Sequence, residues 1–374
     1  MTRPSRGACL SAMTADRHAV IVGGSLVGKC AALALSRDGW RVTLLERFAE
    51  LTGGTGISVD RRRLALVTGI ESDALPVVEV GFAATAWQLL SAVLSAELQQ
   101  RPGVCVRTGE RVLEVIPGSE AGSPSIVATT DGELAAGLVV GADGHASTVR
   151  RFVAPKHPHA SYGGYLLWRG LIDERKVEGG FTGREIRFTE HEMAPARLVT
   201  FGVPGGDGGT RPGQRRASFT WFDPGRTELL RQSGLLDGEI VTGSFTGDDV
   251  PADIVTELRN EAQRWPSPWS AAIDRSLAQR DFIATPVAEY LPTHLIRGST
   301  ALIGDAAHVV SPVTGAGFHN GLLDVHALST ALRRTPRERI DQALTRYQQL
   351  RLPHARRLVT QSRRWSSWYV LSTR

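Results

Sequence analysis

Apolar runs of two different lengths alternate along the chain, and this pattern predicts a mixed α/β protein. A short apolar strand is expected at residues 19–22, followed by a helix rich in Ala and Leu that ends at Gly39 and a second strand at 41–45. An amphipathic helix is expected at 85–100, and strands at 103–108, 111–116 and 125–130. Strands alternating with helices are typical of a parallel sheet covered by helices.

The second half of the chain has a different pattern, in which strands follow one another. Strands are expected at 163–172, 184–190, 196–203 and 216–222, with a glycine-rich hairpin loop at 202–214 and helices near 226–235 and 252–265. After a further strand at 301–303, the chain ends in a long helix from Gly317 and a basic helix over 341–374, which Pro353 is expected to break. Consecutive strands of this kind indicate a mostly antiparallel second domain.

Length and composition narrow the class of protein. At 374 residues with 42% hydrophobic residues, the chain can bury the cores of two domains. The net charge is +5, but the arginines are scattered, so we expect no nucleic-acid partner. No apolar run has the length of a membrane span and no signal peptide is recognisable, which predicts a cytoplasmic protein without a membrane partner. Residues 1–16 are expected to be a disordered leader, with Met13 as an alternative start.

The cysteines and histidines do not form a metal site by their spacing. Cys9, Cys30 and Cys105 are too far apart for a CxxC pair, which fits a reducing compartment. His308 and His319 are not spaced as a ligand set, and no glycine-flanked nucleophilic serine accompanies them. We therefore predict no metal.

The first strand, helix and second strand enclose the motif with the clearest chemistry. Glycines at positions 23, 24 and 28 let the backbone turn tightly and approach a pyrophosphate, whose charge is met by the N-terminus of the following helix. Glu46 ends the second strand, where a carboxylate can accept hydrogen bonds from ribose hydroxyls. Ser25 replaces the second glycine of the usual motif and can itself donate to phosphate. The stretch predicts a dinucleotide site formed by Gly23, Gly24, Ser25, Leu26, Val27, Gly28 and Glu46.

Two later segments repeat the arrangement of a strand that ends in glycine and aspartate. The strand before Gly141 leads to Asp143, with Ser147 as the expected cap of a short helix; an ordinary strand-to-helix turn explains this segment equally well. The strand at 301–303 leads to Gly304 and Asp305, and a loop then brings glycines to the start of a long helix. Together these segments indicate one long ligand that crosses the sheet, bound by Asp143, Gly304, Asp305, Gly315, Ala316 and Gly317.

These three segments together resemble the group A flavoprotein monooxygenases, which have the para-hydroxybenzoate hydroxylase fold. The resemblance is clear over 18–47, 134–150 and 280–335, and its style is nearest to the dihydroxypyridine and hydroxynicotinate hydroxylases. It implies a Rossmann-like FAD-binding domain, a mostly antiparallel substrate domain and a C-terminal helix. The implied boundaries are 17–75, 84–155 and 283–340 for FAD binding, 76–83 and 156–282 for substrate, and 341–374 for the C-terminal segment.

The resemblance also implies which residues meet the cofactor. The first motif with Arg47 and Val112 would hold the ADP half of FAD, and Asp305 would bind the ribityl chain. Gly315–Gly317 would place a helix N-terminus at the flavin ring, where it stabilises negative charge. Many members of the family carry an arginine for the pyrophosphate at the start of the 85–100 helix, where this chain has Trp87. Arg47 or Gln88 is expected to compensate, or FAD is held less tightly.

The implied activity is a monooxygenase that uses FAD, NADH or NADPH, and O2 to hydroxylate or epoxidise an aromatic or polycyclic small molecule through a flavin C4a-hydroperoxide. The nicotinamide would bind transiently, because the chain has no second complete GxGxxG unit. Two alternatives stay open, a flavin-dependent reductase or oxidase and a degenerate, non-catalytic flavin-binding protein. The oligomeric state is expected to be monomer or homodimer.

Residues that contact the substrate are less clearly indicated. Trp168 and Trp221 fall on expected strands of the second domain and either stack on an aromatic substrate or belong to the core. Arg169 either pairs with an anionic substrate or points outward. Pro312 corresponds to the family's loop proline beside the flavin, whose carbonyl could orient a substrate hydroxyl, or only stiffens a turn. His308 either shapes its loop or transfers a proton.

Overall fold

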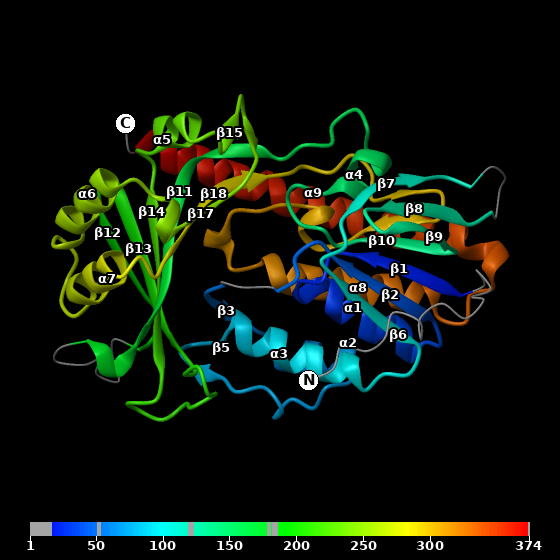
Figure 1. Cartoon of the computed structure of the whole chain (residues 1–374), viewed down its shortest axis with the longest axis horizontal. Coiled ribbons are helices and arrows are strands. Elements are labelled where there is room, and N and C mark those ends of the chain that lie inside the picture. The colour runs from blue at the N-terminus through cyan, green and yellow to red at the C-terminus, as the bar shows by residue number, and fades with distance from the viewer. Residues whose placement is uncertain (1–16, 51–53, 119–122, 178–180, 182–185, 373–374) are drawn as a thin grey trace.

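The computed structural model describes residues 17–50, 54–118, 123–177, 181 and 186–372. Within these residues the strands form two large sheets, which lie at opposite ends of the view in Figure 1, and two small ones. The long helix α9 (Ile340–Ser372) contacts both halves, since it packs on α8 (Gly317–Leu332) and on strands β11 (Ser161–Asp173) and β18 (Ile283–Glu289). The expected leader, with Met13 and Cys9, lies outside the described residues.

The first large sheet contains the strands whose carboxyl ends lead into the three sequence motifs. Its strand order is β19-β20-β10-β1-β2-β6, and all neighbours are parallel except β19 and β20. Strands β1 and β10 are buried along their whole length, which is why their sequences are continuously apolar rather than alternating. The bounds are β1 His18–Val22, β2 Arg41–Glu46, β6 Val104–Thr108, β10 Leu138–Gly141, β19 Ile296–Arg297 and β20 Thr300–Leu302.

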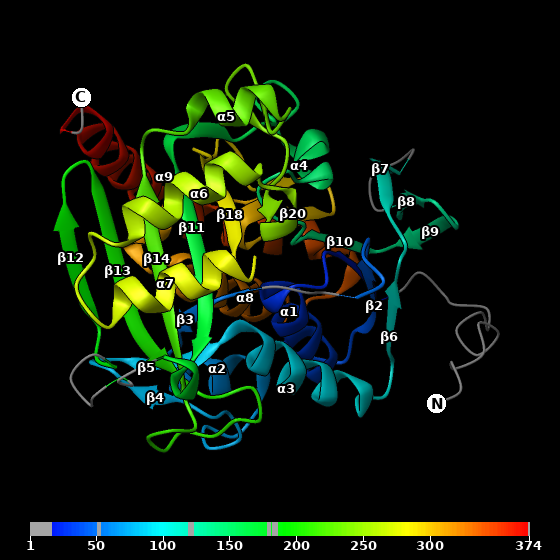
Figure 2. The same ribbon diagram turned by 60° about the vertical axis from the view of Figure 1, so that its left-hand side comes forward.

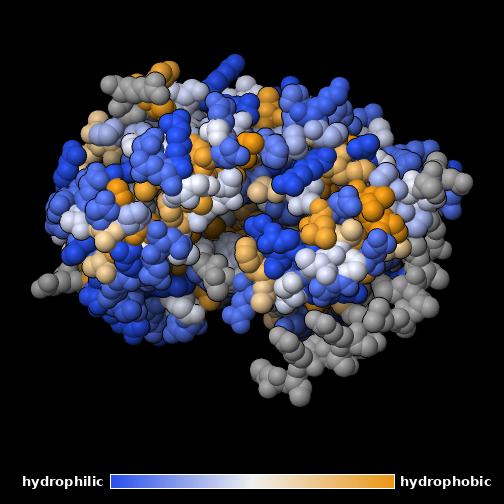
Figure 3. All heavy atoms as spheres, turned by 45° about the horizontal axis from the view of Figure 1, so that its top comes forward, coloured by the Kyte–Doolittle hydropathy of each residue, from blue (hydrophilic) through white to orange (hydrophobic). Residues whose placement is uncertain are grey.

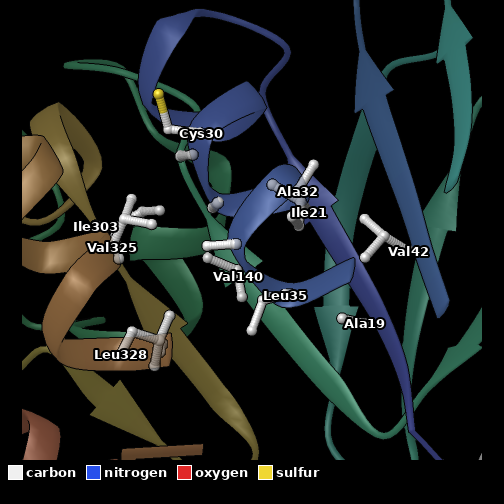
Figure 4. Close-up of a cluster of buried hydrophobic side chains, with 14 of the residues drawn as sticks. Ala19, Ile21, Cys30, Ala32, Leu35, Val42, Val140, Ile303, Val325 and Leu328 are labelled. Carbon is white, nitrogen blue, oxygen red and sulfur yellow. The ribbon is translucent and has the colours of Figure 1, made fainter. Parts of the chain in front are cut away.

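Helices cover this sheet and form the core with it. Helix α1 (Leu26–Arg37) packs on α8 and on α3 (Trp87–Gln99), and Figure 4 shows side chains of α1, such as Cys30 and Leu35, among those of the sheet and of α8. The shorter helices α2 (Arg61–Thr68) and α4 (Thr148–Val153) complete the unit. Small side chains on α1 let it lie close to the strands, which brings its N-terminus to the end of β1.

Two small antiparallel sheets flank the first one. One has the order β7-β8-β9, with bounds Val112–Ile116, Ser125–Thr129 and Gly132–Ala136. The other has the order β3-β5-β4, with bounds Gly56–Ser58, Ala83–Ala86 and Val78–Glu79. The second of them links the two halves of the molecule, because the amide of Gly56 donates to the hydroxyl of Ser218 in the other large sheet.

The second large sheet is antiparallel, as the run of consecutive strands predicts. Its main path is β12-β13-β14-β11-β16-β15, and β18 pairs with both β11 and β17. Helices α6 (Ala252–Ala262) and α7 (Trp269–Ala278) lie in front of this sheet in Figure 2, and α5 (Thr227–Gln232) lies near its upper end. The remaining bounds are β12 Thr189–Met193, β13 Ala196–Val203, β14 Arg216–Asp223, β15 Leu236–Asp237, β16 Ile240–Val241 and β17 Phe245–Thr246.

Three expectations about single elements are wrong. The strand expected at 184–190 begins at Thr189 and ends at Met193, and residues 182–185 lie outside the described part. Strand β18 belongs to the second sheet, so the chain leaves that sheet after Glu289 and not at residue 283. Helix α9 runs through Pro353 without a break. Buried residues on both sides, including Tyr347 and Val359, hold α9 against the protein and outweigh the lost hydrogen bond of one proline.

The surface is mixed in character. On the face shown in Figure 3, hydrophobic residues lie scattered among hydrophilic ones. None of the helices in the described ranges combines the length and apolarity that a membrane span requires.

Candidate functional site

A cavity of about 370 Å³ lies where the carboxyl ends of β1, β2 and β10 meet the loops that follow them. This edge of a parallel sheet, at the ends of its strands, is where open α/β folds bind ligands. Residues from all three sequence motifs line the cavity: Gly23, Ser25, Leu26, Val27, Glu46, Arg47, Val112, Asp143, Asp305 and Gly317. The tertiary structure therefore brings together residues that are almost 300 positions apart.

The glycine turn between β1 and α1 fits only glycine at two positions. Gly23 has φ of +105°, and a Cβ there would lie 2.3 Å from the carbonyl oxygen of Ala142. A Cβ on Gly28 would lie 1.9 Å from the carbonyl oxygen of Gly23. Gly28 does not line the cavity, so its role is to let α1 approach the turn. Ser25 is the N-cap of α1, and its hydroxyl makes no capping bond, which leaves it available to a ligand.

Glu46 connects the turn to the second strand. Its carboxylate accepts the amide of Gly24 at 2.8 Å and the amide of Phe48 at 3.0 Å, and the residue is 6% exposed. Each carboxylate oxygen has a further lone pair, so Glu46 can still accept a hydroxyl from the cavity side. Gly24 therefore contributes through Glu46 and does not itself line the cavity.

Asp143 stabilises the start of a helix, a role that the sequence did not decide. Its carboxylate accepts the hydroxyl of Ser147 at 2.5 Å and the amides of Thr148 and Val149 at 2.7 and 3.1 Å, which makes it a cap of α4. Ser147 also caps this helix, as expected, by accepting the amide of Arg150. Burial raises the pKa of Asp143, although these hydrogen bonds act in the opposite direction. Asp143 thus shapes the cavity wall while it satisfies the helix N-terminus.

Arg150 was missed by the sequence motifs although it joins two of them. Its guanidinium, which is fully buried, donates to the carbonyls of Asp305 and Ala306 at 3.2 and 3.1 Å and to the carbonyl of His145. It also lies over the ring of Tyr290, 4.2 Å from the centroid. The sequence offers little signal, because α4 contains two adjacent arginines, Arg150 and Arg151, and only the structure shows that Arg150 is the buried one. Arg150 fixes the position of the Gly304–Asp305 turn relative to α4.

The Gly304–Asp305 turn is held from behind by a buried ionic network. Asp324 of α8 accepts the amide of Gly304 at 2.9 Å, Nε2 of His308 at 2.7 Å and Nε of Arg351 at 2.7 Å. Burial alone would raise the pKa of Asp324, but His308 and Arg351 hold it below its ordinary value. Burial alone would lower the pKa of His308, but Asp324 raises it. This network orients Asp305, whose own pKa is raised by burial at the cavity.

His308 does not line the cavity and is 1% exposed. A direct proton transfer to a substrate, one of the two hypotheses for this residue, has no geometric support. The alternative, that His308 shapes its loop, agrees with its bond to Asp324.

The segment before α8 forms a short exposed turn, Pro312–Thr314, which ends at Gly315 with φ of +57°. Ser311 anchors it, since its hydroxyl is 2.5 Å from the hydroxyl of Tyr165 and its amide donates to Ser362. Gly317 begins α8 at the cavity, while Gly315 and Ala316 set the turn without lining the cavity. Pro312 is exposed beside this helix N-terminus.

The two tryptophans proposed to stack on a substrate belong to the core. Trp168 is fully buried, and its indole N–H donates to Asp223 at 2.9 Å. Trp221 is 1% exposed, packs on Trp265 and lines a different cavity, next to Asp223. Both residues pack in the cluster that includes residues of α6 and α7. Neither indole lines the first cavity, because their face of the sheet is covered by helices.

Arg169 points to the other face of the same sheet. Side chains alternate along a strand, so Arg169 shares its face with Leu167, which packs with Phe222 and Val287 near the Pro312–Thr314 turn. Its guanidinium donates to the hydroxyl of Thr285 at 3.2 Å, its Nε has no partner, and it forms no ion pair with the residues that the structure describes. Burial lowers the pKa of Arg169 to about 10. The residue is partly exposed, and the bond to Thr285 holds its guanidinium against the sheet.

The cavity residues fit the ADP half and the ribityl chain of FAD. Close backbone approach at Gly23, a carboxylate at Glu46 and helix N-termini at Ser25 and Gly317 supply the contacts that ribose and pyrophosphate require. Arg47 and Val112 lie at the cavity as the resemblance implied.

Comparison with known proteins agrees with this geometry. Residues 270–362 match a family described as FAD binding domain, and residues 162–247 match one described as FAD binding domain-like. A 2,6-dihydroxypyridine 3-monooxygenase of Paenarthrobacter nicotinovorans is 26% identical over 84% of this chain and 82% of its own length. A 6-methylsalicylate 1-monooxygenase of Aspergillus terreus and an FAD-dependent urate hydroxylase of Klebsiella pneumoniae are each 27% identical, but the aligned part covers only 46% and 53% of those proteins.

Solved structures show the same fold. The 2,6-dihydroxypyridine-3-hydroxylase from Arthrobacter nicotinovorans superposes with a TM-score of 0.74 at 21% identity, over 95% of this chain and 92% of that one. Klebsiella pneumoniae HpxO complexed with FAD and uric acid gives a TM-score of 0.68 at 19% identity, over 94% and 88% of the two chains. This chain is similar in sequence and in fold to FAD-dependent aromatic monooxygenases. The resemblance, the fold class, the class of enzyme and FAD as the cofactor, all predicted from the sequence, are thereby confirmed.

Proposed function

We propose that this flavoprotein monooxygenase uses NADH or NADPH and O2 to hydroxylate a small planar aromatic compound that carries an ionised oxygen or a carboxylate. The relatives named above act on a dihydroxypyridine, a methylsalicylate and urate, which share this chemistry. The observation that carries the proposal is Arg169, a partly buried residue whose Nε is buried without a partner and whose guanidinium has no carboxylate partner in the described structure. An unpaired buried cation is costly, and an anionic substrate would compensate it.

Each group of cavity residues has its own role, which follows from its position. The flavin, when bound, supplies hydride acceptance and oxygen activation. Gly23, Ser25 and Glu46 anchor the nucleotide half, and Asp305, which is exposed at the cavity, would orient the ribityl chain. The N-terminus of α8 at Gly317 favours negative charge beside it.

The substrate would lie between this helix N-terminus and the face of the second sheet that carries Arg169. Pro312 is one of the exposed residues of the intervening turn, and its carbonyl, which accepts the amide of Gly315 at 2.9 Å, would use its second lone pair to orient a substrate hydroxyl. Apolar residues of that face, such as Leu167 and Val287, exclude water from the reacting atoms. We assign the parallel sheet with α1, α3 and α8 to FAD binding and the antiparallel sheet to the substrate.

The test is turnover with a matched panel of substrates. The purified holoenzyme is mixed with NADH or NADPH and with 2,6-dihydroxypyridine, 6-methylsalicylate or urate, and oxygen uptake and the transfer of ¹⁸O from O2 to product are measured. Substrate-stimulated oxidation with ¹⁸O in the product supports the proposal. Hydride consumption without ¹⁸O transfer supports a reductase or oxidase, and a protein that binds FAD without turnover supports the non-catalytic alternative.

Arg169→Met is the diagnostic variant, with Arg169→Lys as its charge-preserving control. We expect Arg169→Met to raise KM for a carboxylated substrate by about tenfold to a hundredfold while the bound flavin spectrum is unchanged. Arg169→Lys should retain part of the affinity. Equal KM values in all three proteins would refute the role of Arg169 and leave the monooxygenase activity to be judged by the ¹⁸O experiment.

A further inference from the structure

A buried acid lies behind the turn that leads into α8. Glu289 is the last residue of strand β18 and is 4% exposed. Its carboxylate accepts the hydroxyl of Ser362 and, at 3.2 Å, the hydroxyl of Ser366, and both serines are buried residues of α9. Among the residues that the structure describes, no cationic side chain donates a hydrogen bond to this carboxylate. Neutral hydroxyl groups therefore hold the acid in the interior.

Two routes of buried hydrogen bonds lead from this acid to the turn. The hydroxyl oxygen of Ser362 accepts the amide of Ser311 at 2.8 Å. The hydroxyl of Ser366 lies 3.3 Å from that of Tyr165, which in turn lies 2.5 Å from the hydroxyl of Ser311. Ser311 is fully buried and caps the Pro312–Thr314 turn, since its hydroxyl accepts an amide of that turn at 3.2 Å. Both the backbone and the side chain of Ser311 are thus held by the same acid.

The carboxylate also decides the direction of every hydroxyl in this network. Each hydroxyl has a single proton to donate. Ser362 and Ser366 donate theirs to Glu289, so Ser366 can only accept from Tyr165. The tyrosine oxygen must then accept the proton of Ser311, whose lone pairs stay free for the amide of the turn. With Glu289 ionised, the network has one arrangement.

Stability alone does not explain an acid at this position. Burial raises the pKa of Glu289 above its ordinary value. Folding stability therefore falls as pH rises from that ordinary value toward the raised pKa, and the loss persists at higher pH. A glutamine would present a carbonyl oxygen to the same two serines without this cost. The residue that is present is the less stable choice at neutral pH.

We infer that Glu289 is a positioning residue for the hydroxylation: through the two serines of α9 it orients Ser311 and holds the Pro312–Thr314 turn in place against the substrate. A charged acceptor makes hydrogen bonds roughly twice as strong as a neutral one, and it cannot turn round to become a donor. The C-terminal helix thereby takes part in the site without touching the substrate. This inference rests on the proposed function, because the turn matters for turnover only if it contacts the substrate.

The competing explanation is that the network only attaches α9 to the second sheet. The guanidinium of Arg363 adds to such an attachment, because it donates to the backbone carbonyl of Glu289 at 3.3 Å. If attachment were the whole role, a weaker network would lower Tm and leave the substrate in place. The two explanations therefore differ in whether substrate positioning and stability change together.

The experiment compares Glu289→Gln and Ser362→Ala with the control Ser367→Ala, which removes an exposed hydroxyl of the same helix. Each holoenzyme is given NADH or NADPH and whichever of 2,6-dihydroxypyridine, 6-methylsalicylate and urate the wild type hydroxylates fastest. The measured quantities are KM, Tm, and the share of consumed NADH or NADPH that is recovered as ¹⁸O-labelled product. A misplaced substrate should lower that share, because the reacting atoms are no longer aligned.

We expect Glu289→Gln and Ser362→Ala to raise KM and to lower the product share by about threefold to tenfold. Glu289→Gln should do so with a Tm equal to or above that of the wild type, because it removes the cost of burying a charge. Ser362→Ala should lower Tm, because it leaves the buried amide of Ser311 without its acceptor. Ser367→Ala should match the wild type in all three quantities.

A pH profile separates the charge of Glu289 from its shape. Protonated glutamic acid is neutral like glutamine, so the difference between wild type and Glu289→Gln should close as pH falls through the raised pKa. The ionisable groups that face Glu289 are Arg363 on α9 and Tyr165 on β11, and burial raises the pKa of this tyrosine, so both keep their charge state over that range. The ionisation of the substrate is common to both proteins and cancels in their ratio.

Three results would overturn the inference. The first is a wild-type KM and product share in Glu289→Gln, whatever its Tm. The second is a loss of product share in Glu289→Gln that comes with an equally clear loss of Tm, which is the result of attachment alone. The third is a difference between wild type and Glu289→Gln that stays constant over pH. A wild-type protein that forms no ¹⁸O-labelled product would refute the proposed function, and this inference with it.

Discussion

A substitution of Asp324 gives the most direct test of how the Gly304–Asp305 turn is held in place. It is fully buried and accepts three hydrogen bonds, from the amide of Gly304, from His308 and from Arg351. Asp324→Asn conserves shape and one acceptor oxygen but leaves the Arg351 guanidinium, which is 6% exposed, without a countercharge. Removing one partner of a buried ion pair costs about 3–5 kcal/mol. We expect a loss of this size in the free energy of unfolding.

The measurement is urea unfolding of the cofactor-free protein, followed by circular dichroism, with Tm as a second observable. A loss of about 4 kcal/mol should lower Tm by roughly 5–10 °C for a protein of this size. Because the Gly304 amide depends on the same carboxylate, the affinity for FAD should fall too. Ser95→Ala serves as a control for Tm, because Ser95 lies outside the ionic network around Asp324.

The double variant Asp324→Asn, Arg351→Met decides whether the cost arises from the stranded charge. Removing both charges should make the double variant more stable than Asp324→Asn by about 1–3 kcal/mol, a clear departure from additivity. Two single losses that simply add, or a loss below about 1 kcal/mol for Asp324→Asn, would refute the view that a buried ionic network holds the turn.

Further predictions follow from single contacts. Gly28→Ala should abolish flavin binding, seen as a colourless protein, because its Cβ would lie 1.9 Å from the carbonyl oxygen of Gly23; a yellow variant would contradict this. The pKa of His308 is raised in the folded protein above its ordinary 6.5. Its stabilising contribution is therefore complete below pH 6.5 and is lost as pH rises through the pKa of the folded protein. His308→Gln should flatten the dependence of Tm on pH in that range, and an unchanged dependence would argue against a titrating His308. Trp168→Phe should cost about 1–3 kcal/mol in urea unfolding, because the carboxylate of Asp223 loses the indole donor, with kcat unaffected if Trp168 is a core residue.

The sequence by itself determined the elements that depend on local chemistry. The turn from Gly23 to Gly28 requires glycine for steric reasons. The continuous apolar strands before this turn and before Gly304 predict a parallel sheet. Three such segments in a fixed order indicated a long ligand across the sheet and carried the resemblance to the flavoprotein monooxygenases, which implied FAD. Ser147 as a helix cap was likewise predictable from its neighbours.

Only the tertiary structure decided which face of an element a residue occupies and what lies across from it. Trp168 and Arg169 are adjacent in sequence, yet Trp168 is covered by helices and Arg169 lies on the opposite face with Leu167 and Val287, because strand side chains alternate and only packing decides which face is covered. Pro353 failed to break α9 because burial along both halves of the helix exceeds the local cost. Asp324 has no motif of its own, since its role depends on partners that lie 16 to 27 residues away on other elements.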